Sequence, residues 1–199
     1  MPAVVVLLAF GYLCGSIPFG LLLTRRTGID VRRAGSGNVG AANVARTAGA
    51  GLGVLTLIAD AGKGALPVLV TGTVMQAPAL AAAVGFAAFL GHLYPITLGF
   101  AGGKGVATAL GVLLVIAPDA ALAGLVVFTV AFALTRRVSV GSMTGAASAA
   151  VAVALTGRPG VAVASAAVMA LVVLVRHREN IARLRAGTEP RLDLHKNRA

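Results

Sequence analysis

Seven apolar segments separated by short polar connections constrain the fold of this chain more than any other feature. Only 12% of the residues are charged, about half the share found in soluble domains. Most segments approach the ~20 residues that a helix needs to cross the hydrocarbon core of a bilayer. The pattern predicts an all-α, polytopic membrane helix bundle over residues 1–187, followed by a polar cytoplasmic tail at 188–199. The segments are 3–23, 51–72, 77–98, 105–117, 119–135, 141–157 and 160–175.

The distribution of basic residues predicts how this bundle lies in the membrane. If the connections after segments 1, 3 and 5 share one side with the C-terminal tail, that side holds 15 of the 17 Lys and Arg residues. Of the other two, Arg158 lies on the opposite side and Lys63 lies inside the second segment. Because basic loops remain cytoplasmic, we expect seven spans with the N-terminus outside and the C-terminus in the cytoplasm. This explains the net charge of +11 without nucleic acid.

Glycines recur at four-residue spacing, in the pairs 11 and 15, 49 and 53, and 141 and 145. Such pairs allow two helix backbones to approach closely within lipid. We therefore interpret these glycines as contacts between packed helices.

The first predicted cytoplasmic connection contains GSGNVG at residues 35–40, which matches the G-x-G-x-x-G pattern of dinucleotide-binding turns. That fingerprint requires a preceding strand and a βαβ unit, whereas these glycines lie between two membrane segments. The NAD interpretation is therefore disfavoured. Ser36, Asn38 and Asn43 offer neutral hydrogen-bonding groups, and Arg46 offers a planar fork suited to phosphate. Taken alone, the loop fits an anion site and an ordinary polar turn equally well.

The stretch AGGKGVAT favours the anion site. Gly102, Gly103 and Gly105 surround Lys104 where the fourth segment begins, and backbone N–H groups at a helix start together with a lysine form a phosphate cradle. A P-loop would need Gly at position 98 and Ser or Thr at position 105, but these positions hold Leu98 and Gly105. The loop therefore predicts phosphate binding without the features of a nucleotide hydrolase.

Two charged residues lie inside the second segment. Asp60 and Lys63 are three residues apart and share a helix face, and charges at such depth face the interior of a bundle or a wet cavity. We predict an internal ion pair in preference to direct substrate contact. We interpret His92, near the end of the third segment, as a hydrogen-bonding residue of a helix end rather than as a metal ligand.

The residues after the seventh segment include His177 and Asn180, which share a face if this stretch is helical. Neither is needed to anchor charge, so we assign both to a polar pocket. The basic residues around them, Arg178, Arg183 and Arg185, are assigned to anionic lipid headgroups.

Five blocks follow one another along the chain between the apolar segments: GSGNVGAAN, DAGKG, GHLYPITLGFAGGKGVAT, RRVSVGSM and RHRENIARL. Together they resemble the bacterial acylphosphate-dependent glycerol-3-phosphate acyltransferases. Two positions depart from the usual pattern of that family: Ala42 stands where Thr is usual, and Ala101 stands where Lys is usual. Asn43, Arg46 and Lys104 are retained, so we expect activity to survive.

The resemblance implies a seven-span enzyme of the bacterial inner membrane with its active site facing the cytoplasm. It would transfer a fatty acyl group from acyl phosphate to the 1-hydroxyl of glycerol 3-phosphate, giving 1-acyl-glycerol 3-phosphate (lysophosphatidic acid) and phosphate, without a cofactor or metal. Its implied partners are the two substrates, membrane lipids and, functionally, the enzyme that makes acyl phosphate.

Roles for individual residues follow from the resemblance together with the chemistry of the loops. We expect Lys104, His177 and Ser142 to act in catalysis, with Ser139 and Ser142 offering hydrogen bonds from the loop that enters the sixth segment. The proton of the attacking hydroxyl would pass to a substrate phosphate or to His177. The residues expected to bind substrate are Ser36, Asn38, Asn43, Arg46, Gly102, Gly103, Gly105, Ser139 and Asn180.

A small transporter or channel for an anionic, phosphate-bearing solute is the alternative function. Polar loops and a charged pair inside a span fit that function too. The chain has no clear inverted repeat, however, and its polar groups gather at one predicted membrane surface rather than at the midplane. A structural scaffold ranks third, because it would not explain the glycine-lysine loop.

Overall fold

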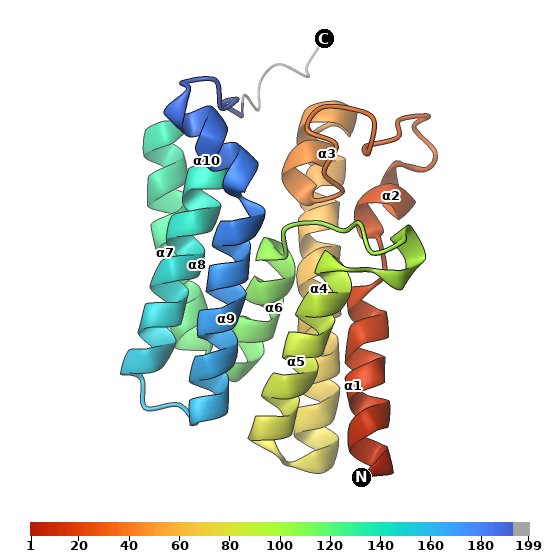
Figure 1. Ribbon diagram of the computed structural model, residues 1–199, viewed down its shortest axis with the longest axis vertical. Helices are drawn as coiled ribbons and strands as arrows, with labels where there is room; N and C mark the ends of the chain where they lie inside the picture. Colours follow the sequence, from red (N-terminus) through yellow and green to blue (C-terminus); the bar gives the residue numbers. More distant parts are fainter. Residues whose placement is uncertain (193–199) are drawn as a thin grey trace.

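All seven apolar segments are helical in the computed structural model, which describes residues 1–192, although the first and the third are each divided into two helices (Figure 1). No strand occurs within these residues, so the all-α prediction is confirmed for them. Residues 193–199 of the predicted tail lie outside the described part. The helices are α1 (Pro2–Gly15), α2 (Phe19–Thr24), α3 (Ala41–Ala48), α4 (Ala50–Met75), α5 (Pro78–Leu93), η1 (Ile96–Leu98), α6 (Val106–Ile116), α7 (Pro118–Thr135), α8 (Val138–Leu155), α9 (Gly160–Arg176) and α10 (Arg178–Arg185).

Five helical stretches are long and apolar enough to cross a membrane, and the pair α9 and α10, bent by 52°, is a sixth candidate. Helix α6 is apolar but has only 11 residues, fewer than the ~20 of a full crossing. A membrane helix bundle with five to six candidate spans is therefore the fold. The five stretches are Pro2–Thr24, Ala50–Met75, Pro78–Leu98, Pro118–Thr135 and Val138–Leu155.

Two segment boundaries differ from the sequence prediction. The first segment, predicted as continuous, breaks between α1 and α2 at Pro18, which lacks a backbone N–H and disfavours a helical conformation in the residue before it. The sixth begins at Val138, three residues before the predicted start at 141. Arg136 adopts a left-handed φ of 58°, so the turn between α7 and α8 needs only two residues. Ser139 and Ser142 consequently lie in the first turns of α8, not in a loop.

Glycine contacts hold the bundle together in pairs of helices: α1 packs on α5, α4 on α6, and α7 on α8. A Cβ atom at Gly15 would overlap the carbonyl of Ala88, and one at Gly145 would press on Phe128. The predicted role in helix packing is thus confirmed for two glycine pairs, Gly11 with Gly15 and Gly141 with Gly145, and for Gly53. It is wrong for Gly49, which has open space beside it and a φ of 100° in the sharp turn between α3 and α4.

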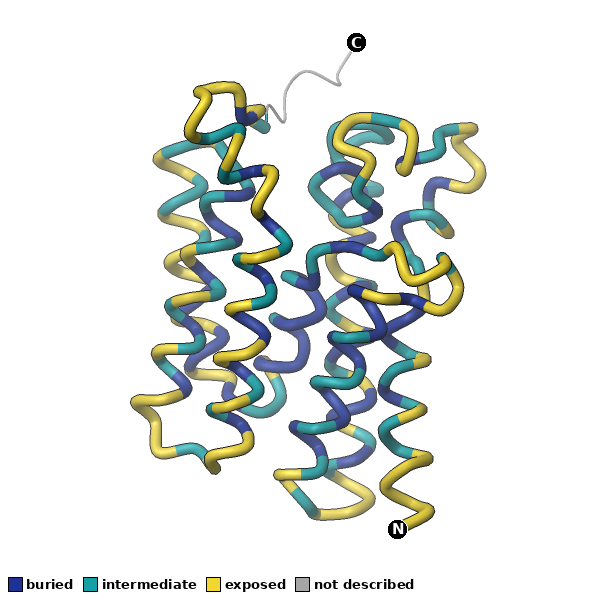
Figure 2. Tube along the Cα trace, in the orientation of Figure 1, coloured by how far each residue is buried: buried dark blue, intermediate teal, exposed yellow. Residues whose placement is uncertain are grey.

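The bundle has two groups of helices, α1, α4 and α5 on one side and α7, α8 and α9 on the other, with α6 between them (Figure 1). The central stretches of α5 and α6 are mostly buried, whereas the outer helices carry exposed residues along their length (Figure 2). The largest buried side chains of the core include Phe89, Leu93, Val112 and Met169. Helices α2, α3 and α10 lie at the end of the bundle opposite the N-terminus.

Candidate functional site

A cavity of about 280 Å³ lies at this end of the bundle, between α3, α4, α6, α7, α8 and the junction of α9 with α10. Val54 and Leu57 of α4 and Phe128 and Phe132 of α7 also line it, so its walls are partly apolar. The sequence assigned twelve residues to the site, and only Gly102 and Gly103 do not line the cavity. The ten that do are Ser36, Asn38, Asn43, Arg46, Lys104, Gly105, Ser139, Ser142, His177 and Asn180.

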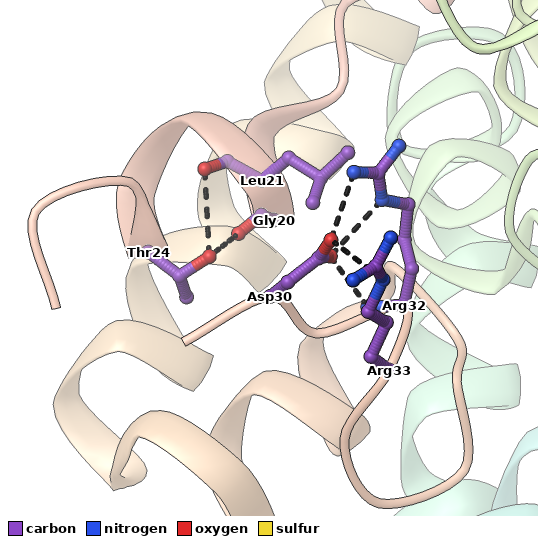
Figure 3. A network of polar contacts seen from close by, with 6 residues as sticks. All are labelled: Gly20, Leu21, Thr24, Asp30, Arg32 and Arg33. Atoms are coloured by element: carbon purple, nitrogen blue, oxygen red, sulfur yellow. Dashed lines mark hydrogen bonds and ion pairs between the residues drawn. The ribbon is translucent and has the colours of Figure 1, made fainter. Parts of the chain in front are cut away.

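Local contacts order the chain that leads from α2 into the first loop (Figure 3). The Thr24 hydroxyl donates to the carbonyl of Gly20 at 2.7 Å. The Asp30 carboxylate accepts the Arg32 backbone N–H at 3.0 Å and Arg32 Nη2 at 2.8 Å, with Arg33 Nε at 4.0 Å. The side-chain hydrogen bond from Arg32 is the main reason that the pKa of Asp30 falls to about 2. These contacts fix the approach to GSGNVG.

Asn43 organises this loop instead of binding substrate. Its side chain is buried, and its Nδ2 donates to the carbonyls of residues 31, 34 and 38 at 2.9, 3.0 and 2.9 Å. Its Oδ1 accepts the Ser36 N–H at 2.8 Å. Because Nδ2 carries only two hydrogens, none remains for a ligand. The predicted donation from Asn43 to substrate is therefore corrected: the amide sets the position of Ser36 beside the cavity.

Arg46, one turn further along α3, is a cation whose side chain forms no ion pair or hydrogen bond with the residues that the structure describes. Its Nε is buried and has no hydrogen-bond partner within residues 1–192. A buried donor without a partner costs free energy, and a guanidinium offers parallel N–H groups that match the oxygens of a phosphate. Arg46 thus presents an unpaired positive fork to the cavity.

The second loop is held by its own backbone, which corrects a prediction. The N–H groups of Gly102 and Gly103 donate to the carbonyls of Leu93 and His92 at 3.1 Å each, so they are not available to a phosphate. The carbonyls of both glycines accept Arg176 Nη2 at 2.9 Å. Glycine is needed here because a Cβ atom at 102 or 103 would overlap the His92 carbonyl or imidazole.

The available amides lie at the first turn of α6. Gly105 adopts a left-handed φ of 82°, and the N–H groups of Gly105, Val106 and Ala107 make no backbone hydrogen bond among the described residues. All three residues line the cavity. Free N–H groups at a helix start attract anions. The predicted phosphate cradle therefore begins at Gly105, after the paired glycines.

Lys104 belongs to a chain of polar contacts that ends in the predicted tail. Its Nζ donates to Asn180 Oδ1, and Asn180 Nδ2 donates to Glu189 Oε1 at 2.6 Å. Burial lowers the pKa of Lys104 to about 8, and the nearby Arg183 guanidinium adds to the effect. Arg183 Nε lies 2.7 Å from Glu189 Oε2, which corrects its assignment to lipid headgroups.

His177 lies where α9 bends into α10, which is helical as expected. Its Nδ1 is 2.8 Å from the carbonyl of Val173. A carbonyl only accepts hydrogen bonds, so Nδ1 carries the proton and Nε2 is left as an acceptor. Burial lowers the pKa of His177 to about 4, which keeps the imidazole neutral at pH 7. His177 is thus a hydrogen-bond acceptor and a weak base.

Of the charged pair of α4, Asp60 lines the cavity and Lys63 does not. Lys63 Nζ is 2.8 Å from Asp60 Oδ1 and donates to the carbonyl of Ile17 at 2.7 Å, so the predicted internal ion pair is confirmed. His92 Nδ1 lies 3.9 Å from the same carboxylate oxygen and has no hydrogen-bond partner within residues 1–192. The predicted side-chain hydrogen bond of His92 is therefore not formed at Nδ1.

Sequence reasoning missed two residues of this region. Glu189 was placed in the polar tail, and its only signal is its position as a carboxylate just after Gly187, close to Arg183 and Arg185. Arg176 was counted only as a basic residue at the membrane boundary. Its contacts with Gly102 and Gly103 depend on how α9 packs, which no local pattern reveals.

Comparisons with known proteins agree with this arrangement. The family model described as glycerol-3-phosphate acyltransferase matches residues 5–187. The glycerol-3-phosphate acyltransferase of Geobacter sulfurreducens is 52% identical over 186 residues, which cover 94% of this chain and 96% of that relative. The protein of the same description from Anaeromyxobacter dehalogenans strain 2CP-1 is 52% identical over 193 residues, with the same coverage.

Two solved structures share the fold along nearly the whole chain. PlsY, an integral membrane glycerol 3-phosphate acyltransferase crystallised in its glycerol 3-phosphate form, matches with a TM-score of 0.92 and 41% identity over 96% of both chains. Its lysophosphatidic acid form matches with a TM-score of 0.89 and 40% identity, also over 96% of both chains. With these matches, the chain belongs to the glycerol-3-phosphate acyltransferase family.

Proposed function

We propose that this protein transfers a fatty acyl group from acyl phosphate to the 1-hydroxyl of glycerol 3-phosphate. The observation that carries the proposal is the cavity, in which Arg46, Lys104 and the free amides at the start of α6 meet apolar walls. Such a site suits substrates that join a phosphate to a hydrocarbon chain. The crystallised relative has a glycerol 3-phosphate form and a lysophosphatidic acid form; both molecules carry a phosphate, and the second also carries an acyl chain.

The reaction needs positioning and charge stabilisation more than a protein nucleophile. Acyl phosphate is a mixed anhydride, so its carbonyl carbon is already activated. The glycerol 1-oxygen attacks that carbon, the new C–O bond forms, and the bond from the carbon to the phosphate oxygen breaks. Lys104 and the free amides from Gly105 to Ala107 stabilise the negative charge that develops. Ser36, Arg46 and Ser142 hold the phosphates and hydroxyls in place.

The geometry of His177 bears on the fate of the proton. Its free Nε2 accepts a hydrogen bond from the attacking hydroxyl and so orients it. A base works best when its pKa is near the working pH, and the pKa of His177 is about 4. A phosphate monoester has its second pKa at about 6. We therefore assign the proton to a substrate phosphate and a positioning role to His177.

The same proposal places the protein in the bacterial inner membrane. Seven crossings, with α6 as a short fourth span, would put the N-terminus outside and the site in the cytoplasm. Two observations support this arrangement: α2, α3 and α10 lie together at the end opposite the N-terminus (Figure 1), and 15 of the 17 Lys and Arg residues belong to the predicted cytoplasmic side. Acyl phosphate would then come from a cytoplasmic enzyme that works with this one.

One assay tests the function. Purified protein in detergent or lipid is mixed with palmitoyl phosphate and glycerol 3-phosphate, and lysophosphatidic acid is measured by mass spectrometry. Palmitoyl-coenzyme A replaces palmitoyl phosphate in a parallel reaction that tests the donor. We expect lysophosphatidic acid to form with palmitoyl phosphate as the donor and not with palmitoyl-coenzyme A. No product, together with passage of glycerol 3-phosphate into liposomes, would favour the transporter.

A further inference from the structure

We propose that Glu189 is a positioning residue of the active site, whose carboxylate fixes the amide of Asn180 so that its oxygen holds Lys104 at the cavity. The inference rests on the proposed acyl transfer. It extends the functional unit beyond residue 187 to residues 188–192, here named the C-terminal strap.

The strap is fixed at both ends. Gly187 adopts a left-handed φ of 72°, and the Thr188 N–H then donates to the carbonyl of Arg183 at 2.9 Å, a pattern that ends helices. At the other end the Leu192 N–H donates to the carbonyl of Arg136 at 2.8 Å. The strap therefore connects α10 to the turn between α7 and α8.

Between these two ends, Glu189 points inward and is only 4% exposed. Its Oε1 accepts Ser139 Oγ and Asn180 Nδ2 at 2.6 Å each, and its Oε2 accepts Arg183 Nε at 2.7 Å. Burial by itself raises the pKa of Glu189, but these three donors outweigh burial and lower it. The carboxylate is therefore ionised and acts only as an acceptor.

The ionisation of Glu189 determines which groups donate and which accept in these hydrogen bonds. An ionised carboxylate only accepts and an ammonium only donates. Asn180 must therefore turn its Nδ2 toward Glu189 and its Oδ1 toward Lys104. With an amide at position 189 the constraint disappears, because a glutamine can itself donate. Asn180 would then be free to turn its own donor toward the Lys104 ammonium, which has no lone pair to accept it.

Charge acts in the same sense as geometry. The charged groups facing Lys104 are Arg46 of α3, Arg183 and Glu179 of α10, and Glu189 of the strap, while His177 is neutral at pH 7. Both carboxylates raise the pKa of Lys104, and the two guanidinium groups lower it. Of these two carboxylates, only Glu189 is buried. Without it, Lys104 would lose its proton at a lower pH.

The test compares Glu189→Gln with Glu179→Gln. Each change removes one negative charge near Lys104, but Glu179 is exposed, and among the described residues its side chain forms no hydrogen bond with the Asn180 side chain, which bonds to Lys104 and Glu189. The constants kcat and KM for both substrates are measured from pH 6 to pH 9. Glu189→Gln is expected to lower kcat/KM at pH 8 by about tenfold, the size of a lost charge-assisted hydrogen bond. The decline of kcat/KM at alkaline pH should also begin at a lower pH in Glu189→Gln, whereas the pH profile of Glu179→Gln should follow that of the wild type closely.

A second measurement does not need activity. The chain contains three lysines, at positions 63, 104 and 196, so NMR of protein labelled with ¹⁵N at Nζ can follow Lys104, with Lys104→Arg identifying its signal. The midpoint of its titration should fall in Glu189→Gln and fall less in Glu179→Gln, whose charge is exposed and screened by solvent. A wild type that forms no lysophosphatidic acid would refute the acyl transfer, yet the titration would still judge the positioning role.

A double-mutant cycle separates positioning from general support of the fold. At pH 6, where Lys104 keeps its proton, Glu189→Gln should cause no further loss of kcat/KM in an Asn180→Ala background, because the positioning effect passes through Asn180. Each variant is checked by thermal unfolding, and Glu189→Asp, which keeps the charge, replaces the Gln variant if that one does not fold. It should retain the wild-type Lys104 midpoint. An unchanged midpoint in Glu189→Gln, an equal shift in Glu179→Gln or Glu189→Asp, or additive losses in the cycle would overturn the proposal.

Discussion

Two clusters of ionisable residues in this molecule each contain a lysine, a carboxylate and a histidine, yet their roles differ. One belongs to α4 and α5, where Asp60 and His92 also reach the wall of the cavity, and the other belongs to the loop before α6, the junction of α9 with α10 and the C-terminal strap. The members are Asp60, Lys63 and His92 in the inner cluster, and Lys104, His177 and Glu189 in the outer cluster.

The inner cluster is paired within itself, although Asp60 and His92 also line the cavity. Lys63 is paired with Asp60 at 2.8 Å and donates to the carbonyl of Ile17 at 2.7 Å, so its charge is balanced and two of its three N–H donors are used. The hollow beside it measures about 10 Å³, room for roughly one water. Because Ile17 lies in the break between α1 and α2, this cluster connects that break to α4.

The outer cluster is open. Arg46, Lys104 and Arg183 face one buried carboxylate, Glu189, beside a cavity of about 280 Å³. An excess of positive charge next to open space leaves a place for an anion, which a substrate phosphate would fill. The difference shows that uncompensated charge with room beside it, rather than residue type, distinguishes a site from a structural contact.

The largest effect is expected at the inner cluster. Asp60→Asn removes one partner of a buried ion pair and leaves Lys63 without a counter-charge, which should cost about 3–5 kcal/mol of stability. Unfolding in detergent, followed by circular dichroism, measures this loss. The KM of the remaining folded enzyme should stay unchanged. Unaltered stability with a raised KM would instead make the inner cluster part of the site.

Lys104→Ala should lower activity and leave stability unchanged, the opposite of Asp60→Asn. We expect kcat/KM to fall by about 100- to 1,000-fold, as when a donor that stabilises a developing oxyanion is removed, with no lowering of the unfolding temperature. Initial rates and thermal unfolding on one preparation test both halves. Wild-type rates in this variant would refute the phosphate cradle.

Arg46→Lys should have a smaller effect, because it keeps the positive charge and loses only the parallel N–H groups of the guanidinium. Loss of paired contacts to a phosphate predicts a rise in KM of about tenfold for the substrate that Arg46 holds. Arg33→Lys is the matched control, since the Arg33 side chain is 89% exposed and lies outside the cavity. Equal behaviour of the two variants would show that Arg46 contributes only general charge.

Much of this arrangement was predictable from the sequence. Apolar length and the segregation of charge located all seven helical segments, because burying an apolar stretch in lipid depends on local composition. The polar loops between them named ten residues that line one cavity. The paired positions of Asp60 and Lys63 also predicted their contact, since helical spacing alone places them on one face.

The errors arise where function depends on contacts between distant parts of the chain. Asn43 and Asn180 are both asparagines beside a cavity, but only the fold shows that Asn43 donates both of its hydrogens to its own loop. The amides of Gly102 and Gly103 are occupied by α5, across a turn that contains no recognisable pairing signal. Glu189 lies beyond the end of a helix, where composition indicated only a tail.

The smallest effect is expected for His177→Gln, and it decides how the proton moves. The imidazole is neutral at pH 7 because burial lowers the pKa of His177 to about 4, so protonation would disturb it only as the pH falls toward that value. A glutamine can still accept a hydrogen bond from the substrate hydroxyl, and turnover at saturating substrate should stay within about tenfold of the wild type. General-base catalysis is worth about 100- to 10,000-fold. A loss of kcat in that range, with KM unchanged, would return the proton to His177 and remove the substrate phosphate from that role.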